Sequence, residues 1–243
     1  MVGAVSTADV LLVWEEGIEK GNLDRGLGLL GLVRPDVPRS RLELIPIGRR
    51  NRALLELRRA LFGPSLRLMA TCPRCALELE VGVEVDTLLM APTPGSDTIT
   101  CQADGWWIEC RLPTTADLRQ ALQSGGEAQA MAEVCIQRVQ GPDDEQQVTP
   151  DQIPPSTMLL LIDQWMEKDP LTLIELGLAC EGCGTQWSTP LDVVEHVFVE
   201  VGVLAGRVLQ DVHTLARAYG WREVDILAMS PRRRQVYLNL VRG

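Results

Sequence analysis

Apolar residues recur at helical spacing along most of this chain of 243 residues. Thr7 is placed to cap a first helix that ends at Gly21, and Pro35 limits a second one. The predicted helices, in chain order, span about residues 7–20, 23–33, 48–61, 115–123, 127–137, 156–168, 190–219, 223–228 and 231–241. A polar stretch at residues 141–155 separates two of these helices and is expected to be an exposed loop.

A period of two replaces the helical pattern after Cys75. Apolar side chains alternate with glutamates from Leu77 to Val85, which predicts a half-buried strand. A further strand is predicted around residues 174–178, directly after Asp169-Pro170. The strands are therefore few and short beside the helices.

Asp104-Gly105 is a strong signal for a two-residue hairpin turn. Such a turn places Cys101 and Cys110 on one apolar face, offset from each other, while Trp107 falls on the outer face. Both cysteines are interpreted as small core residues, with a disulfide as the alternative, and Trp107 is a candidate interface anchor. The predicted register pairs Ala103 with Trp106, Cys101 with Ile108, and Ile99 with Cys110.

Composition narrows the function classes. Acidic residues outnumber basic ones by 33 to 23, and the net charge of −10 argues against a surface that binds nucleic acid or anionic membranes throughout. His196 and His213, the two histidines, leave few groups for acid-base catalysis near neutral pH, and both are expected to be ordinary helix residues. We therefore expect no enzyme and no small-molecule substrate.

No targeting or membrane segment is visible in the sequence, since acidic residues interrupt the apolar run near the N-terminus. The seven cysteines form an odd number in a chain too long to need disulfides for its core. A reducing, cytoplasmic location is the expectation, and the cysteines must be explained by metal binding, redox chemistry or packing. Cys135, on the apolar side of its predicted helix, is assigned to packing.

Arginines gather on the predicted helix at about residues 48–61. Such a cluster is most often a solvated helix face, and docking to an acidic partner is the sharper alternative. The cluster consists of Arg49, Arg50, Arg52, Arg58 and Arg59.

Two Cys-x-x-Cys motifs carry the chemistry: Cys72 with Cys75, and Cys180 with Cys183. Two residues between thiolates allow one tight turn to direct both sulfurs at a single ion, and two such knuckles complete a tetrahedral zinc site. Because a closed four-thiolate shell leaves no coordination position for water or substrate, the zinc would be structural. A redox pair in the first motif and two separate half-sites are the alternatives.

The motifs complete the predicted fold class: α+β, mainly helical, with a small antiparallel β zinc-ribbon region and a β-hairpin. The regions are expected at residues 1–65 (N-terminal helical region), 66–112 (first zinc knuckle and hairpin), 113–170 (helical insertion with the exposed loop), 171–189 (second zinc knuckle) and 190–243 (C-terminal helical region). Gly26-Leu27-Gly28-Leu29-Leu30-Gly31 matches the dinucleotide fingerprint by letter, but a predicted helix precedes it where the fingerprint needs a strand.

Four stretches together resemble a family of zinc-knuckle proteins that are encoded alongside phage-like contractile injection systems and are commonly described as phage baseplate proteins. The stretches are RALLELRRALFGPSLRLMATCPRC, RLPTTADL, LACEGCGTQW and DVHTLARAYGWREVDILAMSPRRRQVYLNLV, in this order. On the family's pattern, the metal ligands would be Cys72, Cys75, Cys180 and Cys183. The first knuckle departs from that pattern in having Ala76 where the family has glycine.

The resemblance implies a structural or assembly role in the baseplate of a phage-like contractile injection system or phage tail. The implied partners are other baseplate or tail proteins, and the protein would be cytoplasmic or incorporated into a phage-like particle. The alternative is a zinc-ribbon module that binds nucleic acid or works in transcription, against which the acidic net charge already weighs.

Overall fold

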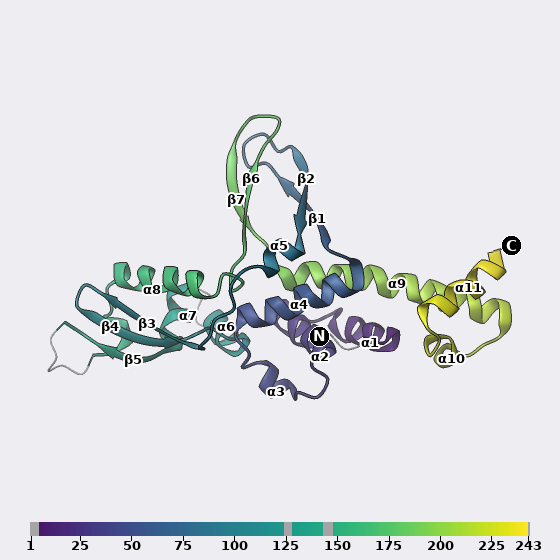
Figure 1. The fold of residues 1–243 in the computed structure, drawn as a ribbon, viewed down its shortest axis with the longest axis horizontal. Helices are drawn as coiled ribbons and strands as arrows, with labels where there is room; N and C mark the ends of the chain where they lie inside the picture. Colours follow the sequence, from purple (N-terminus) through teal and green to yellow (C-terminus); the bar gives the residue numbers. More distant parts are fainter. Residues whose placement is uncertain (1–4, 124–127, 143–147, 243) are drawn as a thin grey trace. The chain divides into compact units, whose positions relative to one another are not determined.

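The computed structural model describes residues 5–123, 128–142 and 148–242 (Figure 1). The fold is α+β and mainly helical with small antiparallel sheets, as predicted. The chain divides into two compact units, one made of Met1–Asp36 with Val194–Gly243 and the other of Val37–Val193. The first unit is helical, and the second contains all the described strands and both cysteine motifs.

The helical unit pairs the two ends of the chain. Its helices are α1 (Thr7–Gly17), α2 (Asn22–Val33), α9 (Val193–Tyr219, whose first residue belongs to the other unit), α10 (Glu223–Leu227) and α11 (Pro231–Arg242). Leu11 of α1 packs with Ala205 and Val208 of α9 in one apolar cluster. The cap of α1 is Ser6, whose hydroxyl accepts the Asp9 N–H, so the predicted cap at Thr7 was wrong by one residue.

The second unit carries three separate sheets. Its helices are α3 (Arg39–Leu42), α4 (Ile47–Phe62), α5 (Val85–Leu89), α6 (Thr115–Gln123), α7 (Ala128–Cys135), the short 3₁₀ helix η1 (Pro150–Gln152) and α8 (Pro155–Lys168). Its strands are β1 (Ser65–Thr71), β2 (Glu78–Glu84), β3 (Thr98–Ala103), β4 (Trp106–Arg111), β5 (Ile136–Gln140), β6 (Glu175–Ala179) and β7 (Gln186–Pro190). The sheets are β1-β2, β3-β4-β5 and β6-β7, and all described pairings are antiparallel.

The predicted hairpin register is confirmed. Asp104 and Gly105 both have positive φ, 50° and 80°, as a tight hairpin turn requires, and the three predicted residue pairs face each other across β3 and β4. The predicted helix to residue 137 was wrong at its end, because strand β5 begins at Ile136. The β-branched Ile136 and Val139 pair with β4 there, so a free sheet edge outweighs helix propensity.

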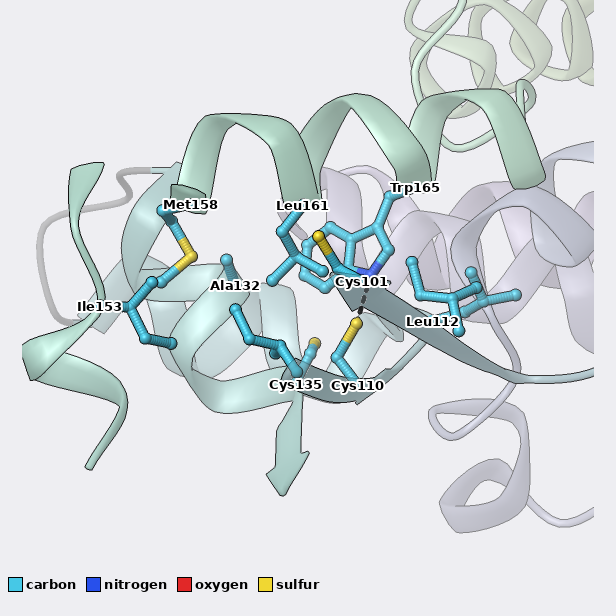
Figure 2. Packing of buried hydrophobic residues seen from close by; sticks show 11 residues of the cluster. Cys101, Cys110, Leu112, Ala132, Cys135, Ile153, Met158, Leu161 and Trp165 are labelled. Atoms are coloured by element: carbon cyan, nitrogen blue, oxygen red, sulfur yellow. Dashed lines mark hydrogen bonds between the residues drawn. The ribbon is translucent and has the colours of Figure 1, made fainter. Parts of the chain in front are cut away.

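Helix α8 covers the three-stranded sheet and closes its core (Figure 2). Trp165 of α8 is buried, and its indole N–H donates to the Sγ of Cys110 at 3.0 Å. Cys101, Cys110 and Cys135 are all buried free thiols of this core, which confirms the packing role and excludes the alternative disulfide. Desolvation raises the pKa of Cys110 to about 11 and that of Cys135 to about 12, so these thiols stay protonated near neutral pH.

The arginines of α4 are used inside the unit. Arg50 and Arg58 are buried, so the prediction of a solvated or docking face was wrong for these two side chains. The reason is that side-chain oxygens, backbone carbonyls and carboxylates of the same unit accept their N–H groups and those of the other three arginines. The partners are Asn51 and Thr115 for Arg50, the carbonyls of Leu89 and Ala91 for Arg52, the Gly63 carbonyl for Arg58, Asp97 for Arg49 and Asp86 for Arg59.

A buried carboxylate marks the start of α4. Asp169 is 2% exposed, and desolvation raises its pKa. Gly48, the second residue of α4, has no side chain to displace this group: a Cβ there would lie 1.9 Å from Asp169 Oδ1. Only glycine at position 48 allows the start of α4 to pack this closely against Asp169 at the end of α8.

Candidate metal centre

Each Cys-x-x-Cys motif forms the turn of its own two-stranded hairpin, and both hairpins rise from the second unit (Figure 1). In the first turn, the Cys72 N–H donates to the Leu77 carbonyl at 2.9 Å. The Ala76 N–H donates back to the Cys72 carbonyl at 3.0 Å. These two bonds close the loop between β1 and β2 and direct both thiols to the same side of the turn.

The second turn repeats this pattern. The Cys180 N–H donates to the Thr185 carbonyl, and the Gly184 N–H donates to the Cys180 carbonyl, both at 2.9 Å. The two motifs are thus the same local structure, built twice from different residues between the cysteines.

Both turns need a left-handed backbone at the residue after the second cysteine. The φ angle is 71° at Gly184 and 59° at Ala76. Glycine adopts this conformation freely, whereas alanine pays a steric penalty of about 1–2 kcal/mol between its Cβ and the backbone. Ala76 therefore keeps the knuckle geometry at the cost of local strain.

The two knuckles meet. The Sγ atoms of Cys72, Cys75, Cys180 and Cys183 all lie within 4.8 Å of one another. Two sulfur pairs, Cys72 with Cys183 and Cys75 with Cys180, are each 3.6 Å apart. All four cysteines are free thiols, and a tetrahedral ion with metal–sulfur bonds of about 2.3 Å would place its ligands about 3.8 Å apart. The spacing fits one four-coordinate ion that is shared by both motifs.

The residues present thus fit the group that the sequence predicts: the cluster could hold a metal ion. The alternative of two separate half-sites does not agree with this convergence. A ribbon sheet that joins the knuckles is not observed among the described strands, because β1-β2 and β6-β7 each form a separate two-stranded sheet. The zinc-ribbon part of the fold prediction is therefore not confirmed.

The four sulfurs differ in exposure. Cys72 and Cys180 are buried, Cys183 is half-buried and Cys75 is exposed. The tips also touch directly, because Leu77 of the first hairpin lies against Gly182 of the second: a Cβ at Gly182 would come within 3.1 Å of Leu77 Cδ2. One side of the cluster is thus packed and the other faces solvent, which leaves an entry path for an ion.

Electrostatics within the cluster favour a cation. The Thr185 hydroxyl, 3.2 Å from the Cys183 Sγ, and the Thr185 backbone N–H lower the pKa of Cys183 to about 6. The Leu77 backbone N–H acts in the same direction on Cys75, but the three neighbouring thiol groups outweigh it and raise the pKa of Cys75 to about 12. Four thiolates in so small a space repel one another, and a divalent cation removes that repulsion.

The donor set decides what such a centre can do. Four thiolates suit zinc and other soft ions, and they complete a tetrahedral shell without a water ligand. Among the described residues, no other group of His, Cys, Asp and Glu converges in this way, and the cluster contains no histidine. The arrangement can join two hairpins rigidly, with no coordination position left for a substrate.

Other residues singled out by the sequence lie elsewhere. His196 and His213 are helix residues of α9, as predicted, and Gly26 to Gly31 lie inside α2, where no strand precedes them to form a dinucleotide loop. Trp107 lies half-buried on β4, opposite Gln102. Thr185 was not predicted from the sequence. Its hydroxyl follows Cys183 by two residues and is within reach of the Cys183 sulfur because the chain folds back into a hairpin there.

Comparison with known proteins adds no family to this description. No protein-family model, curated protein or solved structure matches the chain. Within the part of the chain that the structure describes, no helix has both the length and the apolar character needed to cross a bilayer.

Proposed function

We propose that this chain is a structural or assembly component of the baseplate of a phage-like contractile injection system or phage tail, with a structural zinc ion in the four-cysteine cluster. Its partners are other baseplate or tail proteins. The proposed role is non-catalytic, and the zinc fixes one hairpin of the second unit against the other.

The observation that carries the proposal is the convergence of Cys72 and Cys75 with Cys180 and Cys183. These motifs lie in two of the four stretches whose order resembles the baseplate family. The closed thiolate set supports a role in holding shape, because four thiolates leave no coordination position for a water ligand. Zinc is the proposed ion because it prefers tetrahedral thiolate coordination and undergoes no redox change.

The hairpins also offer surface for a protein partner. Met69 of β1 is 68% exposed and Leu77 is 43% exposed, so large apolar side chains face solvent beside the cluster. A rigid zinc-bound support lowers the entropy lost when such side chains dock. The five arginines of the α4 cluster, which all have partners within the unit, are not needed for this role.

The nucleic-acid alternative gains no support from the charges near the cluster. Residues 65–84 and 175–190 contain five acidic and two basic residues. Four thiolates bound to one divalent cation add further negative charge. A phosphate backbone would be repelled by this region.

The test is assembly. The tagged chain, co-expressed with the tail and baseplate genes of a contractile system from its own genome, should co-purify with those proteins and yield contractile particles visible by electron microscopy. C72S/C180S should abolish particle formation, whereas the core variant C101S should retain it because Cys101 is not in the cluster. Complete particles formed without the chain, or a wild-type chain recovered free of every tail protein, would contradict the proposal.

A further inference from the structure

A cavity of about 420 Å³ lies in the second unit, among α4, α8 and the segment that follows β7. Its volume is within the usual range for sites that bind small molecules. Most of its lining is apolar and includes Met131, Met166 and the indole of Trp165. Thioether and indole groups adapt well to apolar ligands of varied shape.

The polar groups of this cavity include a buried cation. Arg50 lines the cavity and is only 7% exposed. Desolvation lowers the pKa of Arg50 to about 10, and the negative charge of Asp192 raises it by a smaller amount. The guanidinium therefore stays charged near neutral pH. A charge this deeply buried is costly unless polar groups surround it.

The hydrogen bonds of Arg50 leave part of its capacity unused. Nε and Nη2 donate to Asn51 Oδ1, and Nη1 donates to Thr115 Oγ1. A guanidinium has five N–H groups, so by count one remains on each terminal nitrogen as a donor for an anion. Thr172 also lines the cavity, but its hydroxyl interacts with the buried carboxylate of Asp169 and lowers the pKa of that group, so it is not a free donor.

From the apolar lining and the buried guanidinium, we propose that this cavity binds a small amphipathic carboxylic acid. The carboxylate lies against Arg50, and the apolar part fills the space lined by Met131, Met166 and Trp165. The site is separate from the four-cysteine cluster and does not depend on the proposed baseplate role.

The charge of Asp192 opposes an anion. Asp192 also lines the cavity and is exposed to solvent. Its negative charge weakens the attraction of Arg50 for a carboxylate, and solvent screens this effect. Replacement of Asp192 by asparagine should therefore strengthen carboxylate binding, and the same change should weaken the binding of a cation.

The test uses octanoate, 1-octanol and octylammonium, three probes with the same apolar chain, titrated by calorimetry into the full chain. Octanoate should bind saturably at one site per chain and at least about tenfold more tightly than either other probe. D192N should increase octanoate affinity by about two- to fivefold. Equal affinity for all three probes, a preference for octylammonium, or no saturable octanoate binding would overturn the proposal.

Two surface variants locate the site without disturbing the fold. Leu173 lines the cavity and is 44% exposed, while Leu160 of α8 has the same exposed fraction and lies outside the cavity lining. L173W should reduce octanoate affinity at least about tenfold by filling the cavity, and L160W should change it less than about twofold. If L173W and L160W changed octanoate affinity equally, the ligand would bind outside this cavity and the proposed site would be wrong.

Discussion

Ala76 and Gly184 occupy the same position in the two knuckles, one residue after the second cysteine, and both have a positive φ. Only one of them is the residue type that this backbone favours. A76G should stabilise the zinc-loaded protein by about 0.5–1 kcal/mol, because relief of the left-handed strain exceeds the added entropy of the unfolded chain. G184A should destabilise it by about 1–2 kcal/mol for the reverse reason.

Urea unfolding in the presence of zinc measures both changes. Gly177 of β6 provides the control, since it has no positive φ and nothing lies within 4 Å of a Cβ built there. G177A should leave stability within about 0.5 kcal/mol of wild type or raise it slightly. If A76G and G184A shifted stability in the same direction, the equivalence of the two turns would be wrong.

A second prediction concerns Gly48, whose missing side chain makes room for Asp169. G48A should destabilise the protein by about 2–3 kcal/mol, because the new methyl group must displace a buried carboxylate. Gly31 is a matched glycine, inside helix α2 with open space around a Cβ, and G31A should stabilise by about 0.5–1 kcal/mol. Thermal unfolding of G48A and G31A measures both stability changes. A G48A protein as stable as wild type would refute the packing argument.

A third prediction is the pH dependence of the contact between Arg111 and Asp117. Both oxygens of Asp117 accept from the guanidinium, and the Thr114 N–H and hydroxyl also donate to this carboxylate. Desolvation raises the pKa of Asp117, but these four donors outweigh it and hold the pKa below its usual value. The D117N variant should therefore have a free energy of unfolding about 2–4 kcal/mol lower than wild type at pH 7. At that pH the wild-type carboxylate is charged in both the folded and the unfolded state.

The difference between wild type and D117N must shrink in acid. A carboxyl with a lowered folded pKa stabilises fully above its unfolded pKa, near 3.9, and loses that contribution as the pH falls through the folded value. Urea midpoints at pH 7, 5 and 3 should show a constant gap at the two higher values and a smaller gap at pH 3. A gap that persists unchanged at pH 3 would show that the charge of Asp117 is not what stabilises the contact.

The sequence predicted local structure best where one residue pair sets the geometry. Asp104-Gly105 determines the turn, and because the side-chain period of a strand is two, the facing pairs of β3 and β4 follow from it. The two Cys-x-x-Cys motifs likewise determine their own turns. Their convergence was predictable from the chemistry of tetrahedral zinc, although 104 residues separate the motifs.

Features that depend on tertiary contacts were missed. The strand β5 forms only because β4 offers a free edge, and no local signal in residues 136–140 shows that edge. The burial of Arg50 and Arg58 depends on acceptors that include Thr115, which is 65 residues from Arg50. The sequence also did not show that the two hairpins form separate sheets. The spacing of the cysteines specifies which sulfurs can share an ion, but not whether the strands beside them pair.

The metal content of the purified chain tests the central claim most directly. Elemental analysis combined with X-ray absorption at the zinc edge should give one zinc per chain with four sulfur neighbours at about 2.3 Å. C75S and C183S should each lose stoichiometric zinc, while the core variant C135A should retain it. A wild-type chain without stoichiometric metal, or a zinc ion held by nitrogen and oxygen neighbours, would contradict a shared four-cysteine centre.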